Sequence, residues 1–235
     1  MTRIRFQQSL EDLKEKLLVM AGLAEQSIQR AIEAYRERDL SICDLVSRGE
    51  IDINLLEREI DQAALDLLAM EQPMAGDLRF ILSVIKINAE LERVGNSAKS
   101  ISERVRHMER MDAAELPVNI PRMASLASDM VRKSLQSFIE ADAETARSIL
   151  TMDDAVDAMN KAAFKSLIKV MEEQSHLAPQ ALNALMISRA LERVADHATN
   201  IAEDVIFWVQ GDDVRHHNSL NRDAEQQGSG GANAS

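Results

Sequence analysis

The chain carries one short pattern twice, as LERVGNSAKSISER at residues 91–104 and as LERVADHATNIAED at residues 191–204. Over residues 91–103 and 191–203, seven of thirteen aligned positions are identical. In both copies apolar residues recur every three or four positions, the spacing that places them on one face of an α-helix. The repetition predicts that the chain consists of two similar helical halves.

The same apolar spacing extends on both sides of each copy, and breaker residues separate the periodic segments. Gln72-Pro73, the linker MDAAELPVNIP at residues 111–121, and HLAP at residues 176–179 each interrupt a run. Only eight glycines and four prolines occur in 235 residues, which favours helix. The predicted helices are residues 10–35, 40–71, 75–110, 121–140, 143–174 and 178–210.

Three helices in each half predict an all-α protein of two tandem three-helix bundles related by an internal repeat, because a solenoid needs more and shorter repeats. The expected domains are a first bundle at residues 1–110, a linker at 111–120 and a second bundle at 121–217. Residues 218–235 are too polar to pack, so we expect a disordered tail there.

Composition excludes several classes of protein. With 46% hydrophobic and 28% charged residues the chain is globular, and a formal charge of −12 argues against nucleic acid as a partner. No run of eighteen apolar residues and no leader peptide is found, so we expect a soluble, cytoplasmic protein. The single cysteine, Cys43, cannot form an internal disulfide.

The second copy of the repeat aligns oxygen-bearing side chains. Glu192, Asp196 and Asn200 are four residues apart and therefore project from one face of a helix. Asp153 and Asp157, also four apart, lie on the preceding helix, and antiparallel packing would bring them opposite this stripe. Facing carboxylates in helical bundles form sites for iron or manganese, so we predict a metal site here.

In the first half the equivalent positions hold fewer charges. Glu50 and Asn54 would face Glu92, Asn96 and Ser100. Because neutral oxygens bind cations less strongly than carboxylates, this set is the weaker candidate.

Other readings of these residues stay open. Glu192 beside Arg193, with Arg189 one turn earlier, is also typical of an ion-pair network on a solvated helix face. Glu173 and His176 have the Glu-x-x-His spacing of di-iron bundles, but that design needs two copies. His216 and His217 read as a surface pair beyond the last helix.

Four segments together resemble the PhoU family of phosphate-uptake regulators: LERVGNSAKSI at 91–101, LERVADHATNIAE at 191–203, MEQPMAGDLR at 70–79 and VQGDDVRH at 209–216. The resemblance implies two three-helix bundles related by pseudo-twofold symmetry. It also implies metal binding (iron, zinc, manganese or magnesium) through Glu192, Asp196 and Asn200 with Asp153 and Asp157. The first half departs from the family motif at Asn54, Asn96 and Ser100, which leaves Glu50, Glu92 and Asn96 as the doubtful set.

The resemblance further implies a function that spacing alone does not. It is that of a non-enzymatic negative regulator of the phosphate regulon and of phosphate uptake. Such a protein would link the ATPase subunit of a phosphate ABC transporter to a sensor histidine kinase, and it would meet the membrane through these partners. Independently of the resemblance, paired bundles with long apolar-edged helices favour a homodimer. Two alternatives remain: a carboxylate-bridged, metal-dependent bundle enzyme, and a helical module whose stripes are ion-pair networks.

Overall fold

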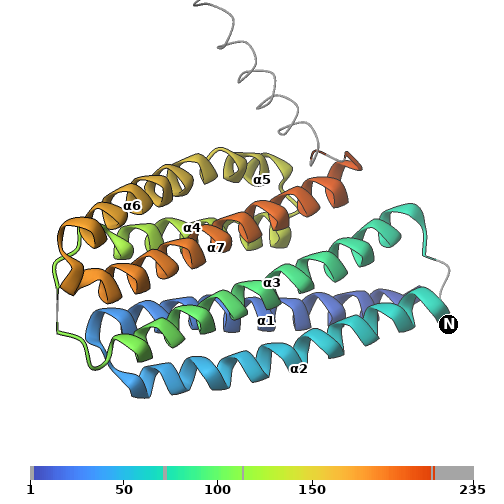
Figure 1. Cartoon of the computed structure of the whole chain (residues 1–235). Helices are drawn as coiled ribbons and strands as arrows, with labels where there is room; N and C mark the ends of the chain where they lie inside the picture. Colours follow the sequence, from blue (N-terminus) through green and yellow to red (C-terminus); the bar gives the residue numbers. More distant parts are fainter. Residues whose placement is uncertain (1–2, 71–72, 113, 213, 215–235) are drawn as a thin grey trace, which may run out of the picture.

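The structure, a computed structural model, describes residues 3–70, 73–112, 114–212 and 214, and these residues form helices without any β-strand (Figure 1). The predicted disordered tail, residues 218–235, and the pair His216 and His217 lie outside the described residues. The elements are α1 (Arg3–Glu37), α2 (Leu40–Met70), α3 (Ala75–Met108), α4 (Ile120–Glu140), α5 (Ala143–Leu150), α6 (Asp153–Glu173), the short 3₁₀ helix η1 (Ser175–Leu177) and α7 (Ala178–Gln210).

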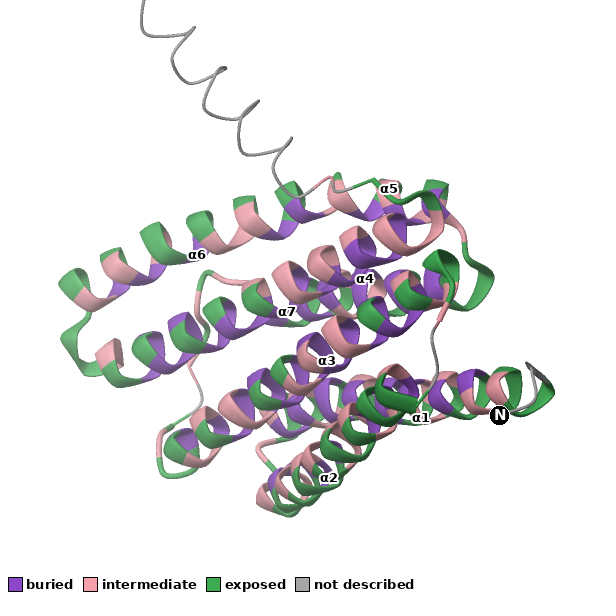
Figure 2. Cartoon of the chain, turned by 90° about the vertical axis from the view of Figure 1, so that its right-hand side faces the viewer, coloured by how far each residue is buried: buried purple, intermediate pink, exposed green. Residues whose placement is uncertain are grey.

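The helices form two bundles, which confirms the predicted all-α fold. Helices α1, α2 and α3 pack against one another, and α4, α5 and α6 pack around α7. Figure 2, in which the ribbon is coloured by burial, shows that the buried residues follow the inner faces of the helices. In α1 the buried face recurs every three or four positions, with Leu10, Leu13, Leu17, Met20, Ala24, Ile28 and Ala31.

One predicted helix is divided. The sequence predicted a single helix over residues 143–174, but α5 ends at Leu150 and α6 starts at Asp153. The Thr151 hydroxyl donates to the carbonyl of Ser148 at 2.8 Å, a local bond that competes with continued helix. Two aspartates then open α6, where the positive end of the helix dipole favours acidic residues. The break therefore places Asp153 on the first turn of α6.

The two bundles meet through α3 and α7, which share the most extensive helix contact, and through α1 and α4. Arg79 Nε donates to the carbonyl of Trp208 at 3.3 Å, and Ser83 Oγ donates to the carbonyl of Asp204 at 3.0 Å. The later of the two α3 residues contacts the earlier of the two α7 residues, so the helices pack antiparallel. The two LERV segments therefore lie together at the centre of this junction.

Aromatic side chains close one end of the junction. The Trp208 ring centroid lies 5.2 Å from Phe80 of the first bundle and 5.2 Å from Phe138 of the second. Aromatic pairs at this spacing add stability beyond the area they bury. This cluster ties α3, α4 and α7 together.

Arg38, which lies between α1 and α2, holds the connection between the two bundles in place. Arg38, whose φ of 54° lies in the left-handed region, donates to the carbonyls of Met111 and, at 3.4 Å, of Asp112. After this connection Asn119 caps α4 by accepting from the backbone N–H of Arg122 at 3.0 Å.

Candidate metal centre

The predicted carboxylates of the second bundle come together. Asp153 and Asp157 of α6 and Asp196 of α7 each offer an oxygen atom, and these atoms lie within 4.8 Å of one another. Asp153 is buried, whereas Asp157 and Asp196 are half-buried. We call these three residues the acid cluster. Successive turns of α6 supply two members and the antiparallel neighbour supplies the third, as the sequence predicted.

Glu192 lies one turn before Asp196 on the same helix and belongs to the same electrostatic environment. Burial raises the pKa of Glu192 above its ordinary value, and the nearby carboxylates of Asp157 and Asp153 raise it further. The ammonium group of Lys161 partly neutralises the negative charge of these carboxylates, since its Nζ lies 3.6 Å from Asp157 Oδ2. The site thus concentrates negative charge that a cation would stabilise.

Asn200, the last predicted member, makes its contact in another direction. Its Nδ2 donates to Glu90 Oε2 of α3 at 3.1 Å, and His197 Nδ1 lies 2.7 Å from the same oxygen. Burial raises the pKa of Glu90, but the hydrogen bonds from His197 and Asn200, together with the positive charges of His197 and Arg93, more than offset burial, so this pKa lies below its ordinary value. The amide nitrogen of Asn200 therefore donates a hydrogen bond across the junction between the two bundles. The sequence analysis missed Glu90 and His197 in this role.

The donor set fits a hard cation. Carboxylate oxygens are preferred by magnesium, manganese and iron, and two oxygens on opposite sides of one such ion lie about 4 to 5 Å apart. Thr199, one turn beyond Asp196, carries a buried hydroxyl oxygen with no hydrogen-bond partner in the described structure. A buried oxygen without a partner, one helical turn from Asp196, is a further potential ligand.

The first bundle fills the equivalent space with its own cation. Asn54 Nδ2 donates to Glu50 Oε1 at 3.1 Å, and Asn96 Nδ2 donates to Glu92 Oε1 at 2.6 Å. Lys99 Nζ lies 3.1 Å from Glu50 Oε1. In the aligned repeat Lys99 matches Thr199, a difference that can be read from the sequence. It was not among the predicted site residues. Ser100, which matches Asn200, is half-buried.

The weaker sequence candidates do not form a site together. Glu173 ends α6 and is 3.7 Å from Lys169, whereas His176 lies in η1, so the two do not share a helix face. Cys43 is buried and its Sγ is 3.6 Å from the carbonyl of Ser102. Both arrangements are those of ordinary structural residues.

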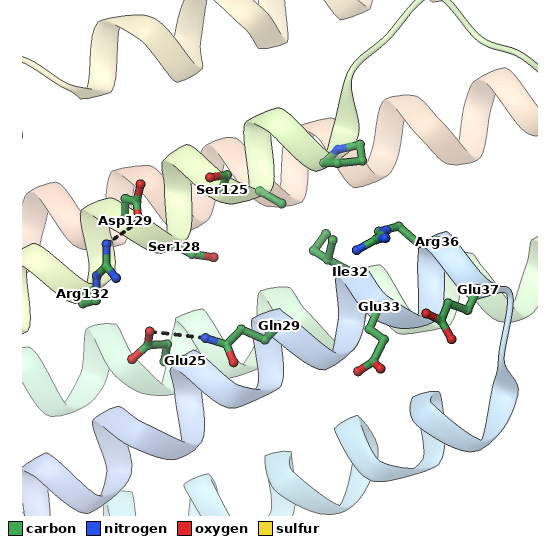
Figure 3. A pocket seen from close by; sticks show the side chains of 12 residues that line it. Glu25, Gln29, Ile32, Glu33, Arg36, Glu37, Ser125, Ser128, Asp129 and Arg132 are labelled. Carbon is green, nitrogen blue, oxygen red and sulfur yellow. Dashed lines mark hydrogen bonds and ion pairs between the residues drawn. The ribbon is translucent and has the colours of Figure 1, made fainter.

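A separate groove of about 430 Å³ lies between α1 and α4 (Figure 3). Acidic and basic side chains both line it, and Asp129 is paired with Arg132 at 2.6 Å. Glu25 accepts from Gln29 on the same helix at 3.4 Å. Four carboxylates and two guanidinium groups line the groove, so its charges are mixed with an excess of acidic groups.

None of the helices in the described residues is long and apolar enough to cross a membrane.

Comparison with known proteins adds a family match over both bundles. The family model of the PhoU domain matches residues 17–105 and again residues 120–205. A phosphate-specific transport system accessory protein PhoU homolog from Pseudomonas aeruginosa is 36% identical over 215 residues, which cover 90% of this chain and 88% of that protein. The accessory protein PhoU of Escherichia coli K12 is 31% identical over 212 residues, with 90% and 88% covered.

Solved structures agree with the sequence relatives. The crystal structure of PhoU from Pseudomonas aeruginosa superposes with a TM-score of 0.84 at 35% identity, covering 88% of this chain and 100% of that chain. The phosphate transport system regulatory protein PhoU from Streptococcus pneumoniae gives a TM-score of 0.82 at 28% identity, with 89% and 99% covered.

Proposed function

Because this chain belongs to the PhoU family, we propose that it is an adaptor that represses phosphate uptake and the phosphate regulon when phosphate is plentiful. Its coarser role, that of a regulatory accessory protein of phosphate transport and not of an enzyme, follows from relatives that bear this name over most of their length. The observation that carries the proposal is the 36% identity over 90% of the chain to one such accessory protein.

The proposed partners are the ATPase subunit of a phosphate ABC transporter and the cytoplasmic part of a sensor histidine kinase. Three helices, α1, α3 and α7, are longer than thirty residues. Helices of this length offer extended faces on which protein partners can dock. We expect the protein in the cytoplasm, near the membrane only through these partners. The homodimer expected from the sequence stays a prediction, which light scattering in solution tests.

We further propose that the acid cluster with Glu192 holds a divalent or trivalent cation, with iron, zinc, manganese and magnesium as candidates. Asp153, Asp157 and Asp196 would be the ligands, and Glu192 and Thr199 are close enough in the helix register to complete the set. Such an ion neutralises charge and fixes α6 against α7. The set Glu50, Glu92 and Asn96 of the first bundle would bind more weakly, since Lys99 already supplies a positive charge there.

Two measurements test the adaptor role. In a strain that lacks the gene, a reporter of phosphate starvation should be expressed in phosphate-rich medium, and the chain supplied from a plasmid should repress it. In a pull-down, the purified chain should retain the ATPase subunit and the kinase fragment, and the assay is repeated after chelation with bound metal measured on the same sample. A reporter that stays repressed without the gene contradicts the proposal.

A further inference from the structure

A pocket of about 300 Å³ lies on the outer side of the second bundle, between α6 and α7. It borders the acid cluster, because Glu192 lines it and Lys161 reaches Asp157. We call it the α6–α7 pocket, and its lining residues are Asn160, Lys161, Phe164, Lys165, Arg189 and Glu192.

The positions that match this pocket in the first bundle have the opposite charge. The buried residues Val156, Ala163 and Leu167 of α6 have the spacing of Ile53, Ile60 and Ala64 of α2, which fixes the alignment of the two helices. The six matching residues are Glu57, Arg58, Asp61, Gln62, Ala89 and Glu92.

That set has three carboxylates and one cationic group, whereas the α6–α7 pocket has three cationic groups and one carboxylate. Burial raises the pKa of Glu57 in the first bundle, and the carboxylates of Asp61 and Glu92 raise it further. The same scaffold position is therefore acidic in one bundle and basic in the other.

An apolar rim extends the α6–α7 pocket. Phe164 lines it and is 51% exposed, and Leu182 and Met186 are 51% and 38% exposed. Leu182, Met186 and Arg189 are spaced to share one stripe of α7, so this rim leads into the pocket. Side chains of this size left in water mark surfaces that a partner covers.

The first bundle again differs at the matching positions. Asp61 stands where the second bundle has Phe164, and Lys86 stands where it has Met186. Lys86 is also engaged, 3.1 Å from Asp204 Oδ1 and 5.0 Å above the ring of Phe207. The first-bundle copy keeps one exposed apolar residue of the rim, Leu82, which matches Leu182 and is 37% exposed, but it lacks the apolar side chains that match Phe164 and Met186.

We propose that the α6–α7 pocket and its apolar rim dock an acidic segment of a partner protein that carries an apolar side chain next to its carboxylates. The carboxylates would pair with Lys161, Lys165 and Arg189, all three of which are exposed. The apolar side chain would cover Phe164, Leu182 and Met186. This inference rests on the proposed function, because it supplies a surface for the partner that an adaptor needs.

The charge of the whole chain favours a specific orientation of such a partner. With a formal charge of −12, the rest of the surface repels an acidic protein, so a local basic patch steers it to one place. Inorganic phosphate would use the cationic groups alone and would leave the apolar rim uncovered. An acidic peptide segment accounts for both features.

Synthetic peptides test the chemistry directly on the full-length chain by isothermal titration calorimetry. The probe is a short peptide of glutamates and leucines, compared with an analogue in which glutamine replaces glutamate and one in which serine replaces leucine. We expect the probe to bind more tightly than either analogue and to weaken as salt rises. Inorganic phosphate is titrated alongside as the competing ligand.

Variants locate the binding. Lys165→Gln combined with Arg189→Gln removes two cationic contacts, and Phe164→Asp installs the first-bundle residue. Each variant should lower the affinity for the peptide by about tenfold or more, and a tenfold change corresponds to about 1.4 kcal/mol of binding free energy. Arg58→Gln, which removes the one cationic group of the matching first-bundle surface, should leave the affinity unchanged. All these residues are exposed, and thermal unfolding checks that each variant folds.

Three outcomes overturn the inference: no binding of any peptide, equal binding by wild type and both pocket variants, or phosphate binding that the acidic peptide does not exceed. A pull-down with the ATPase subunit and the kinase fragment keeps the proposed function separate. If these partners bind wild type and pocket variants equally, the pocket assignment is wrong and the adaptor role stands. If they do not bind wild type, the adaptor role fails, while the peptide titration still decides on the pocket.

Discussion

The two bundles have matching helices, but they differ in which groups lie next to their buried carboxylates. In the first, Glu50 is 3.1 Å from the ammonium group of Lys99, and amide groups replace two of the carboxylates. In the second, Asp153, Asp157 and Asp196 converge and the position of Lys99 is a threonine. The difference teaches that an internal repeat can keep its packing while one copy pairs its carboxylate with a lysine and the other gathers three carboxylates.

The largest effect should come from giving the second bundle the cation of the first. Thr199→Lys places an ammonium group one turn from Asp196, and we expect it to lower the affinity for Mn²⁺ by about 100-fold, since even changes beside metal ligands cost about 10- to 100-fold. Calorimetric titration with Mn²⁺ measures this. Thr199→Val, which keeps the shape and adds no charge, should weaken Mn²⁺ binding far less, because it removes at most one neutral ligand and leaves the three carboxylates in place. Unchanged affinity in Thr199→Lys would show that the acid cluster is not the site.

The junction offers a second test, because its charged contact occurs on only one side of the pseudo-twofold. Glu90 meets His197 and Asn200, while the matching trio is Ala190, Ser97 and Ser100. Glu90→Gln removes a buried carboxylate that accepts hydrogen bonds from His197, Asn200 and Arg93, so we expect a loss of about 2 kcal/mol in the free energy of unfolding.

Urea unfolding measures this loss. Ser97→Ala, the change at the position that matches His197, should cost less than about 0.5 kcal/mol, as expected away from charged networks. Equal losses in the two variants would mean that the charged contact contributes nothing specific to the junction.

The reverse exchange should create a site in the first bundle. The triple variant Asn54→Asp, Asn96→Asp and Lys99→Thr copies the second bundle, and it is made in the Thr199→Lys background so that only the first bundle can respond. We expect Mn²⁺ binding at least about tenfold tighter than in that background alone, because carboxylates replace neutral donors. No gain would show that the backbone of the first bundle, and not its side chains, excludes the ion.

The smallest effect concerns stability without metal. Since the pKa of Glu192 is raised in the fold, its ionised form opposes folding at pH values above the ordinary glutamate pKa. Glu192→Gln should therefore raise the Tm of the chelated protein at neutral pH by about 1 to 2 °C. The gain should disappear at acidic pH, where the carboxyl is protonated in both the folded and the unfolded state. Glu92→Gln should give no gain, because Glu92 is already stabilised by the amide of Asn96 at 2.6 Å.

Sequence reasoning reached the fold because apolar periodicity and helix breakers are local signals. The buried face of α1 and the meeting of Asp153, Asp157 and Asp196 both follow from spacing and antiparallel packing. The break at Thr151–Met152 was not predicted, because no glycine or proline marks it. The direction of Asn200 depends on Glu90 of the other bundle, which lies more than a hundred positions away in the chain.

The aromatic cluster at the end of the junction has an optical consequence. Trp208 is the only tryptophan of the chain, and it touches Phe80 of one bundle and Phe138 of the other. Its intrinsic fluorescence therefore reports how the two halves sit against each other, without any label. A ligand that shifts this emission from the acid cluster or from the α6–α7 pocket would reveal that events on one bundle are transmitted to the seam between both.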